Sequence, residues 1–193
     1  NTEPIRRVME LRSDQVHRYY LANEPTNGNL YLTDPIRRQM LTLKSIEQIP
    51  DIKANLKIAN GFCAGSTLEC ELDNVDFVKS SKHLTYPKEL AFDNNGNMYF
   101  IDGNRVKVLS SVDGLVSTLI GDNENRKVKS MSCNTTYSLD EITMYLPSSL
   151  AINPIDNHLY ILDENAIYRL TSFKTVELVL GVPFNLPHDC YFE

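Results

Sequence analysis

The stretch LAFDNNGNMYFID at residues 90–102 occurs in two further versions in the same chain. These are LANEPTNGNLYLTD at 21–34 and LAINPIDNHLYILD at 150–163. Each version has Leu-Ala, a polar segment rich in Asn, an apolar residue, Tyr, two mostly apolar residues and Asp. Because a pattern that returns at long, similar intervals is typical of repeat architectures, the three copies predict a repeated structural unit.

The sequence that follows each copy repeats as well and predicts two more strands per unit. The Tyr strands, such as MYFI at 98–101, are continuous apolar runs, which is typical of strands buried on both faces. Helical periodicity is weak throughout. The next strands are RRQMLTL (37–43), NRVKVLS (104–110) and NAIYRLT (165–171), and the outer strands, which end in Gly, are NLKIANG (55–61), LVSTLIG (115–121) and TVELVLG (175–181).

Four antiparallel strands per unit, apolar inside and more polar outside, predict an all-β protein built of β-propeller blades. A β-sandwich or an open meander is the alternative, but neither requires a repeated signature. We count three blades and one leading strand, VMELR at 8–12, which would be the outer strand of a preceding blade. Since complete propellers have about four to eight blades, we expect part of a larger ring. Its first and last blades should expose apolar faces.

The spacing of the copies indicates inserts between blades. Leu21 and Leu90 lie 69 residues apart, and Leu90 and Leu150 lie 60 apart, whereas a four-stranded blade takes roughly 40–45 residues. We expect both inserts to be loops that decorate one face. The predicted division is the outer strand of a preceding blade at 1–16, a blade at 17–61, an insert loop at 62–85, a blade at 86–121, an insert loop at 122–146, and a blade and tail at 147–193.

Composition narrows the class of protein. The 193 residues are 42% hydrophobic and 23% charged, which allows one sizeable core. The net charge of −6 argues against a nucleic-acid surface, since phosphate binding is carried by an excess of Lys and Arg. No apolar run approaches the roughly 18 residues of a membrane span, so we expect no membrane contact by this segment. The sequence does not begin with Met, and its first residues, NTEPIRRVMEL, contain no apolar leader, so we expect a piece of a larger protein.

All four cysteines follow the Gly that ends an outer strand: Cys63, Cys70, Cys133 and Cys190. An even number of cysteines in loops favours disulfides in an oxidising compartment. The spacing suggests a local Cys63–Cys70 bridge and a Cys133–Cys190 bridge between neighbouring inter-blade loops. Free or metal-binding cysteines are the alternative, although zinc sites need close pairs with His partners. Asn134, in the tripeptide Asn-Thr-Thr after Cys133, is a candidate for N-glycosylation.

The run DNNGN at 93–97 resembles part of a calcium-binding loop. An EF-hand loop needs Gly at position 6 and an acidic ligand at position 12. Here Gly96 is at position 4 and Asn104 is at position 12, and the other copies lose the carboxylate spacing. Asn-Gly between two apolar strands is instead a strong hairpin signal. We therefore predict that Gly96 and Asn97 are turn residues and that no metal binds.

Asp34, Asp102 and Asp163 recur after each Tyr strand. A catalytic group is normally unique, so a repeated Asp is more simply explained as an acceptor for turn backbone amides. No G-x-S-x-G elbow or phosphate-binding Gly-rich loop is found. The sequence therefore predicts no catalytic residue, no cofactor and no enzyme. The histidines occupy unrelated places in the repeat: His17, His83, His158 and His188.

The segment at 90–121 resembles an NHL repeat, through Asp93, Gly96-Asn97, Tyr99, Asp102 and the ending from Gly114 through Gly121. More particular features are similar to the teneurins, which are large extracellular adhesion receptors. These features are YYLANEPTNGNLYLTD (19–34), PSSLAINPIDNHLYILDENAIYRLT (147–171) and the placement of all four cysteines. The chain departs from the family pattern after the second cysteine, where ELDNVDFVKSSKHL (71–84) replaces a Gly-rich run.

The resemblance implies part of a six-bladed NHL propeller in the extracellular part of a single-pass type II membrane protein. It also implies cell adhesion in neuronal wiring and development, through homophilic teneurin contacts, a latrophilin-type receptor bound by the wider ectodomain, and a homodimeric receptor. The alternative is part of a calcium-dependent propeller hydrolase or lactonase. A third possibility, an intracellular NHL module that binds RNA, is disfavoured by the acidity, the cysteine placement and the glycosylation tripeptide.

Overall fold

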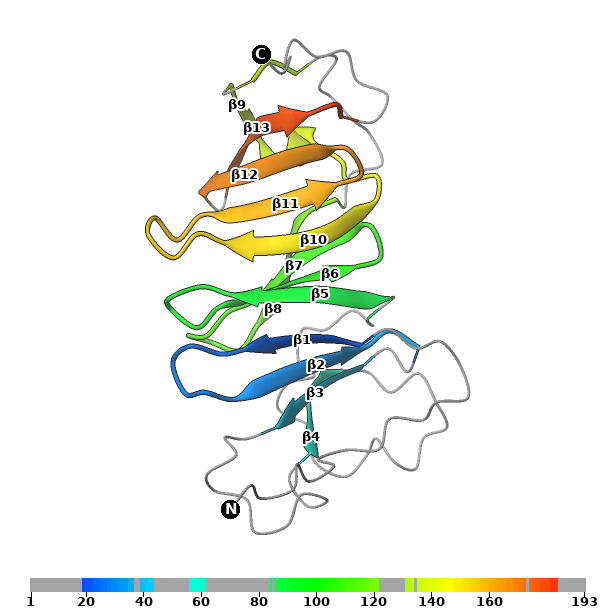
Figure 1. Cartoon of the computed structure of the whole chain (residues 1–193), viewed down its shortest axis with the longest axis vertical. Coiled ribbons are helices and arrows are strands. Elements are labelled where there is room, and N and C mark those ends of the chain that lie inside the picture. Colours follow the sequence, from blue (N-terminus) through cyan, green and yellow to red (C-terminus); the bar gives the residue numbers. More distant parts are fainter. Residues whose placement is uncertain are drawn as a thin grey trace, which may run out of the picture.

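The computed structural model describes residues 19–36, 39–43, 56–61, 84, 86–121, 131–133, 135–172 and 174–183. They form three antiparallel sheets, which lie one after another along the long axis of the molecule (Figure 1). We call these sheets blade 1, blade 2 and blade 3 in chain order. The predicted leading strand at 8–12 lies outside the described residues.

Each blade is a meander in which consecutive strands pair. Blade 1 contains β1 (Tyr20–Asn23), β2 (Leu30–Asp34), β3 (Gln39–Leu43) and β4 (Leu56–Gly61). Blade 2 contains β5 (Pro87–Phe92), β6 (Met98–Asp102), β7 (Arg105–Leu109) and β8 (Val116–Ile120). Blade 3 contains β10 (Pro147–Ile152), β11 (Leu159–Asp163), β12 (Ala166–Ser172) and β13 (Thr175–Gly181), and β9 (Thr136–Ser138) pairs with the outer edge of β13.

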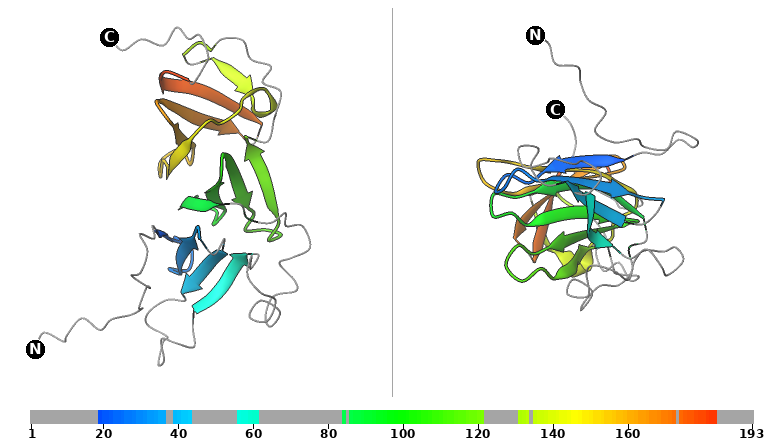
Figure 2. Two further views of the ribbon diagram at one scale, coloured as in Figure 1. Left: turned by 90° about the vertical axis from the view of Figure 1, so that its right-hand side faces the viewer. Right: turned by 90° about the horizontal axis from the view of Figure 1, so that it is seen from below.

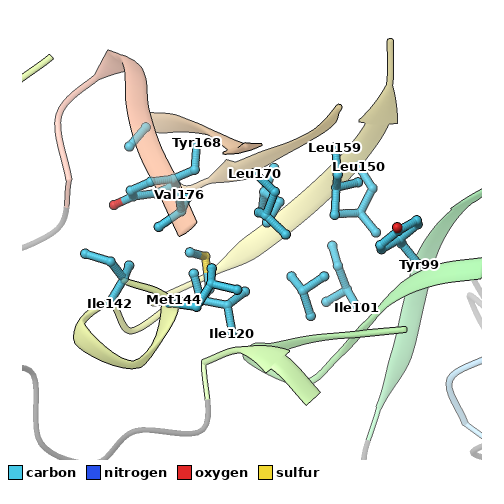
Figure 3. Close-up of a cluster of buried hydrophobic side chains, with 14 of the residues drawn as sticks. Tyr99, Ile101, Ile120, Ile142, Met144, Leu150, Leu159, Tyr168, Leu170 and Val176 are labelled. Carbon is cyan, nitrogen blue, oxygen red and sulfur yellow. The ribbon is translucent and has the colours of Figure 1, made fainter. Parts of the chain in front are cut away.

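The blades pack face to face. The first strand of blade 2, β5, contacts both β1 and β10, and Figure 2 (left) shows β1 and β5 along one side of the molecule with β4 and β8 on the other. One hydrophobic cluster lies between blades 1 and 2, around Met40, Met98 and Phe100. A larger one lies between blades 2 and 3 (Figure 3). Every residue of β6 is buried, which explains its continuous apolar run. The fold is a fragment of an all-β propeller, as predicted.

Gly121 and Gly181 occupy equivalent positions in blades 2 and 3. At each position the outer strand passes close to the backbone of the turn that joins the second and third strands of the blade. A Cβ atom at Gly181 would lie 1.9 Å from the carbonyl oxygen of Asn165, and one at Gly121 would lie 2.4 Å from that of Asn104. Both distances are far inside van der Waals contact, so no other residue fits without moving the backbone. The Gly that ends the predicted outer strand thus has a steric cause in blades 2 and 3.

The interpretation of 122–146 as an insert loop on one face is wrong for its second part. β9 extends the sheet of blade 3, and the 3-10 helix η4 (Leu139–Glu141) follows it directly. Met131, Leu139, Ile142 and Met144 are buried in the cluster between blades 2 and 3, and Figure 3 shows Ile142 and Met144 beside Val176. The segment belongs to the blade because β9 pairs with β13 and the apolar residues around it pack into the cluster between blades 2 and 3.

The two end blades expose apolar side chains, as predicted for part of a ring. Leu21 is 60% exposed on β1, on the face opposite Tyr20 and Ala22, which pack toward blade 2. On blade 3, Leu162 and Leu180 are both exposed, and both pair with Ile167 in the sheet. Leu162 on β11 and Leu180 on β13 therefore flank the half-buried Ile167 of β12.

Candidate functional site

The three hairpin turns between the first two strands of each blade lie side by side. The backbone N–H of Asn94 donates to Oδ1 of Asn157 at 2.9 Å, and its side-chain amide donates to the carbonyl of Pro154 at 3.2 Å. Toward blade 1, a Cβ atom at Gly96 would lie 3.4 Å from the methyl group of Thr26. The inner turns at 24–29, 93–97 and 153–158, with the outer turns at 110–115 and around Lys174, form what we call the turn face.

The turns differ in length because they use different hydrogen bonds. In blade 2, the N–H of Gly96 donates to the carbonyl of Asp93, three residues earlier. In blades 1 and 3, the N–H groups of Gly28 and Asn157 donate to the residue four positions earlier. All three donors have positive φ, at +73°, +80° and +61° for Gly28, Gly96 and Asn157. This difference in hydrogen bonding explains why the copy at 90–102 is one residue shorter than the copies at 21–34 and 150–163.

Asp93 organises the turn that resembled a calcium loop. Its Oδ1 accepts the backbone N–H groups of Asn95 at 2.9 Å and Asn97 at 2.8 Å. Its Oδ2 accepts the side-chain amide of Asn97 at 2.8 Å and the hydroxyl of Tyr99 at 3.2 Å. The buried carboxylate is therefore occupied by donors from its own hairpin. Burial, together with the charge of Asp93, raises the pKa of Tyr99 above its usual value.

The recurring Asp of blade 2 binds a distant amide. Oδ1 of Asp102 accepts the backbone N–H of Tyr86 at 2.7 Å, and Oδ2 lies 2.6 Å from Nζ of Lys107. Tyr86 precedes β5, so Asp102 ties the end of the second strand to the segment that enters the blade. The Tyr86 amide lies 16 residues from Asp102 in the chain.

Asp163 does the same in blade 3, where its carboxylate accepts the backbone N–H groups of Tyr145 at 3.0 Å and Leu146 at 2.5 Å. In blade 1, Asp34 accepts the N–H of Ile36, which does belong to the adjacent turn, at 3.2 Å. All three carboxylates thus bind backbone amides, and none belongs to the turns that form the turn face.

Two hollows open between blades 2 and 3 on the turn face. A groove of about 780 Å³ runs beside β8 and the segment that carries β9 and η4. A smaller cavity of about 200 Å³ lies between Asp93 and Tyr99 on one side and His158 and Thr171 on the other. Within the described residues, no three His, Cys, Asp or Glu side chains gather as metal ligands.

Large apolar side chains stand out at the tips of the turns beside these hollows. Val112 and Ile155 are each 93% exposed, and Leu115 is 47% exposed. The site residues predicted from sequence did not include them, although Val and Ile within the turns SVDG and PID were a visible signal, since turn tips favour Gly, Pro, Asn, Asp and Ser. The neighbouring Asp113 stays ionised to lower pH, because the N–H of Leu115 donates to it and lowers its pKa.

Cys133 is disulfide-bonded. Its backbone pairs with that of Leu178, on the outer strand of blade 3, in an isolated parallel β-bridge. Its sulfur partner lies outside the described residues, so the pairing with Cys190 stays a prediction. Cys63, Cys70 and Asn134 also lie outside them. No described helix has the length and apolar character needed to cross a membrane.

Comparison with known proteins identifies the sequence family. The family described as "Teneurin NHL domain" matches residues 2–190. The chain is 32% identical to teneurin-3 of Danio rerio and of Mus musculus, over 92% of the chain in each case. It is 31% identical to teneurin-m of Drosophila melanogaster, over 94% of the chain. The chain spans about 7% of the length of these curated relatives.

Solved structures show the same fold at lower identity. A gluconolactonase from Xanthomonas campestris is 12% identical, with a TM-score of 0.51 over 88% of this chain and 49% of its own. A protein of unknown function from Bacteroides thetaiotaomicron is 16% identical, with a TM-score of 0.51 over 89% of this chain and 41% of its own. At these identities the likeness concerns the fold alone.

Proposed function

This chain belongs to the teneurin family, as part of its NHL domain, and on that premise we propose that it is a non-catalytic extracellular recognition module. The parent receptor is a single-pass type II membrane protein in this proposal. The disulfide at Cys133 supports an extracellular position, since disulfides persist in oxidising compartments. The match over residues 2–190 supports a role shared with the NHL domain of teneurins.

The observation that carries the proposal is the apolar character of the turn face. Val112 and Ile155 are 93% exposed at the tips of turns on neighbouring blades, and a groove of about 780 Å³ lies next to Val112. Burying such side chains against another protein stabilises a complex by about 25 cal/mol for each Å² removed from water. Exposed apolar groups bordered by polar turn residues are typical of protein-binding surfaces.

The proposed partners follow from the family. We propose homophilic teneurin contacts and a latrophilin-type receptor bound through the wider ectodomain, with adhesion between cells in neuronal wiring and development. The full receptor acts as a homodimer in this proposal. Because the chain is about 7% of the length of its relatives, it supplies one recognition surface within a much larger receptor.

Cell aggregation by the full-length protein tests the proposal. Cells that express the variant with Val112→Lys and Ile155→Lys should aggregate less than cells with the unchanged protein, at equal surface level. The matched control is Leu146→Lys, which places the same charge on an exposed apolar residue next to Asp163, away from the turn face. Equal aggregation by the double variant and the control would contradict the proposal. Deleting 122–146 is unsuitable, because it removes buried side chains.

The hydrolase alternative has its own test. Calorimetry with calcium on the complete propeller should show no tight site if the recognition proposal holds, and a tight site would favour the hydrolase. Titration of free thiols under denaturing, non-reducing conditions separates the extracellular proposal from an intracellular one. Four reactive thiols would contradict the extracellular position.

A further inference from the structure

A chain of hydrogen bonds joins the two turns whose tips carry Val112 and Ile155. It passes through the turn of blade 2 at 93–97, which contacts both of them. On one side this turn accepts hydrogen bonds from Ser111, and on the other side Asn94 donates hydrogen bonds to blade 3. The two exposed apolar tips therefore belong to one connected structure, although they come from different blades.

The outer turn of blade 2 is bound to the inner turn through Ser111. Its backbone N–H donates to Oδ1 of Asn97 at 2.9 Å, and its hydroxyl donates to the carbonyl of Asn95 at 2.8 Å. Asn97 is itself fixed, since its backbone N–H and its side-chain amide both donate to the buried carboxylate of Asp93. Val112 follows Ser111 directly, so Asp93 sets its position through one intervening side chain.

The inner turn of blade 3 is bound through Asn94. The backbone N–H of Asn94 donates to Oδ1 of Asn157 at 2.9 Å, and its side-chain amide donates to the carbonyl of Pro154 at 3.2 Å. These two acceptors lie on either side of Ile155 in the chain. The N–H of Ile155 is held within its own turn by Oδ1 of Asn153, at 3.0 Å. Asn94 therefore fixes the turn that carries Ile155 at two points.

Asn157 has a side chain where the other two inner turns have none. Its φ is +61°, and the equivalent donors in blades 1 and 2 are Gly28 and Gly96, at +73° and +80°. This left-handed backbone disfavours any residue with a Cβ atom, although Asn tolerates it better than most. The side chain that occupies this unfavourable position is the one that accepts the N–H of Asn94. Residues held in such conformations often serve a function that needs their side chain.

We propose that Asn94 and Asn157 are positioning residues of the recognition surface, which fix Val112 and Ile155 relative to each other before a partner binds. A surface that is ordered in advance loses less conformational freedom on binding, so the same contacts give a tighter complex. The partner must then offer apolar surface that meets both tips at once. This proposal rests on the recognition function proposed above and deepens it, because it names the residues that prepare the surface.

Cell aggregation by the full-length protein tests the proposal with Asn157→Gly. This change removes the acceptor for the Asn94 amide and leaves the backbone conformation accessible, since Gly adopts positive φ readily. The surface level needed for half-maximal aggregation should rise at least about twofold, the lower end of the effect of one lost hydrogen bond.

The matched control is Glu164→Gly. Among the described residues, Glu164 and Asn157 are the two that have positive φ without being Gly, and Glu164 is at +53°. It lies in the turn between β11 and β12, at the end of blade 3 opposite the turn face. This variant should aggregate like the unchanged protein. Equal surface levels for half-maximal aggregation in the two Gly variants would overturn the proposal.

A double variant separates positioning from a general loosening of the fold. If Asn157 acts by fixing one tip relative to the other, Asn157→Gly should weaken aggregation less in a protein that already carries Val112→Ala. Effects of independent sites add, whereas effects of coupled sites do not. Strictly additive losses from the two changes would therefore overturn the proposal.

Hydrogen exchange measures the contact directly in the same proteins. The amide of Asn94 should be protected in the unchanged protein and in Glu164→Gly, and should exchange faster in Asn157→Gly. Equal exchange in all three would mean that this hydrogen bond does not hold the turns together, and would overturn the proposal.

The same experiments distinguish this proposal from the recognition function itself. If the variant with Val112→Lys and Ile155→Lys aggregates as well as the Leu146→Lys control, the recognition function fails. If that variant aggregates less but Asn157→Gly behaves like Glu164→Gly, only the positioning role fails.

Discussion

Lys107 places its Nζ 2.6 Å from Oδ2 of Asp102, with both side chains buried inside blade 2. The other oxygen of Asp102 accepts the backbone N–H of Tyr86, so the ion pair also holds the segment that enters the blade. The equivalent of Lys107 in blade 3 is Tyr168, which is buried in the hydrophobic cluster instead. Blade 2 therefore contains a charged pair where its neighbour contains an aromatic ring.

The first prediction concerns this pair. Lys107→Met should lower the free energy of unfolding by about 3–5 kcal/mol, because it leaves the buried carboxylate of Asp102 without its cation. The double variant with Lys107→Met and Asp102→Asn should recover much of the loss, since no unpaired charge remains. Chemical unfolding of the complete domain measures both values. A single variant as stable as the unchanged protein would show that water reaches this pair.

The second prediction concerns alkaline pH. Tyr99 keeps its proton to higher pH in the folded protein than its ordinary pKa of 10.0, chiefly because burial disfavours the phenolate. Above pH 10 the unfolded chain therefore releases this proton while the folded one retains it. The free energy of unfolding contributed by Tyr99 is present below pH 10 and falls as the pH rises above it. Tyr99→Phe should make the decline shallower, and equal slopes would contradict the assignment.

The third prediction compares two glycines with positive φ. Gly181→Ala should destabilise the protein by more than about 2 kcal/mol, because its Cβ would lie 1.9 Å from the carbonyl oxygen of Asn165. Gly28→Ala is the control, since nothing lies within 4 Å of its added Cβ. It should cost only about 1–2 kcal/mol, the penalty of a left-handed backbone. Thermal unfolding measures both, and a smaller loss for Gly181→Ala would contradict the steric explanation.

The fourth prediction tests whether the segment before β10 is part of the core. Ile142 is buried between blades 2 and 3, and Ile142→Ala should cost about 2–5 kcal/mol, through lost burial and the cavity left behind. Leu146→Ala, at a position that is 53% exposed, should change the free energy of unfolding by no more than about 0.5 kcal/mol. If both variants were equally stable, residues 131–144 would be a peripheral loop after all.

The blades could be read from the sequence because their strands follow local rules. The buried β6 is a continuous apolar run, and the turn from Asp93 to Asn97 has the Asn-Gly pair that hairpins favour. The role of the segment before β10 could not be read in this way. β9 has only three residues, and the apolar residues near it in the sequence are scattered. Neither therefore shows the regular spacing of apolar residues that predicts a strand or a helix. β9 is positioned by its pairing with β13, and the apolar residues are positioned by packing between blades 2 and 3.

The candidate site, too, could be predicted from the sequence only in part. The sequence alone determined that Asp93, Gly96 and Asn97 form a turn, because turn chemistry is confined to adjacent residues. Only the tertiary structure decided that Asp102 binds Tyr86, and that Val112 and Ile155 share one face beside a groove. The physical reason is that these relationships join residues far apart in the chain, and their positions depend on how neighbouring blades pack.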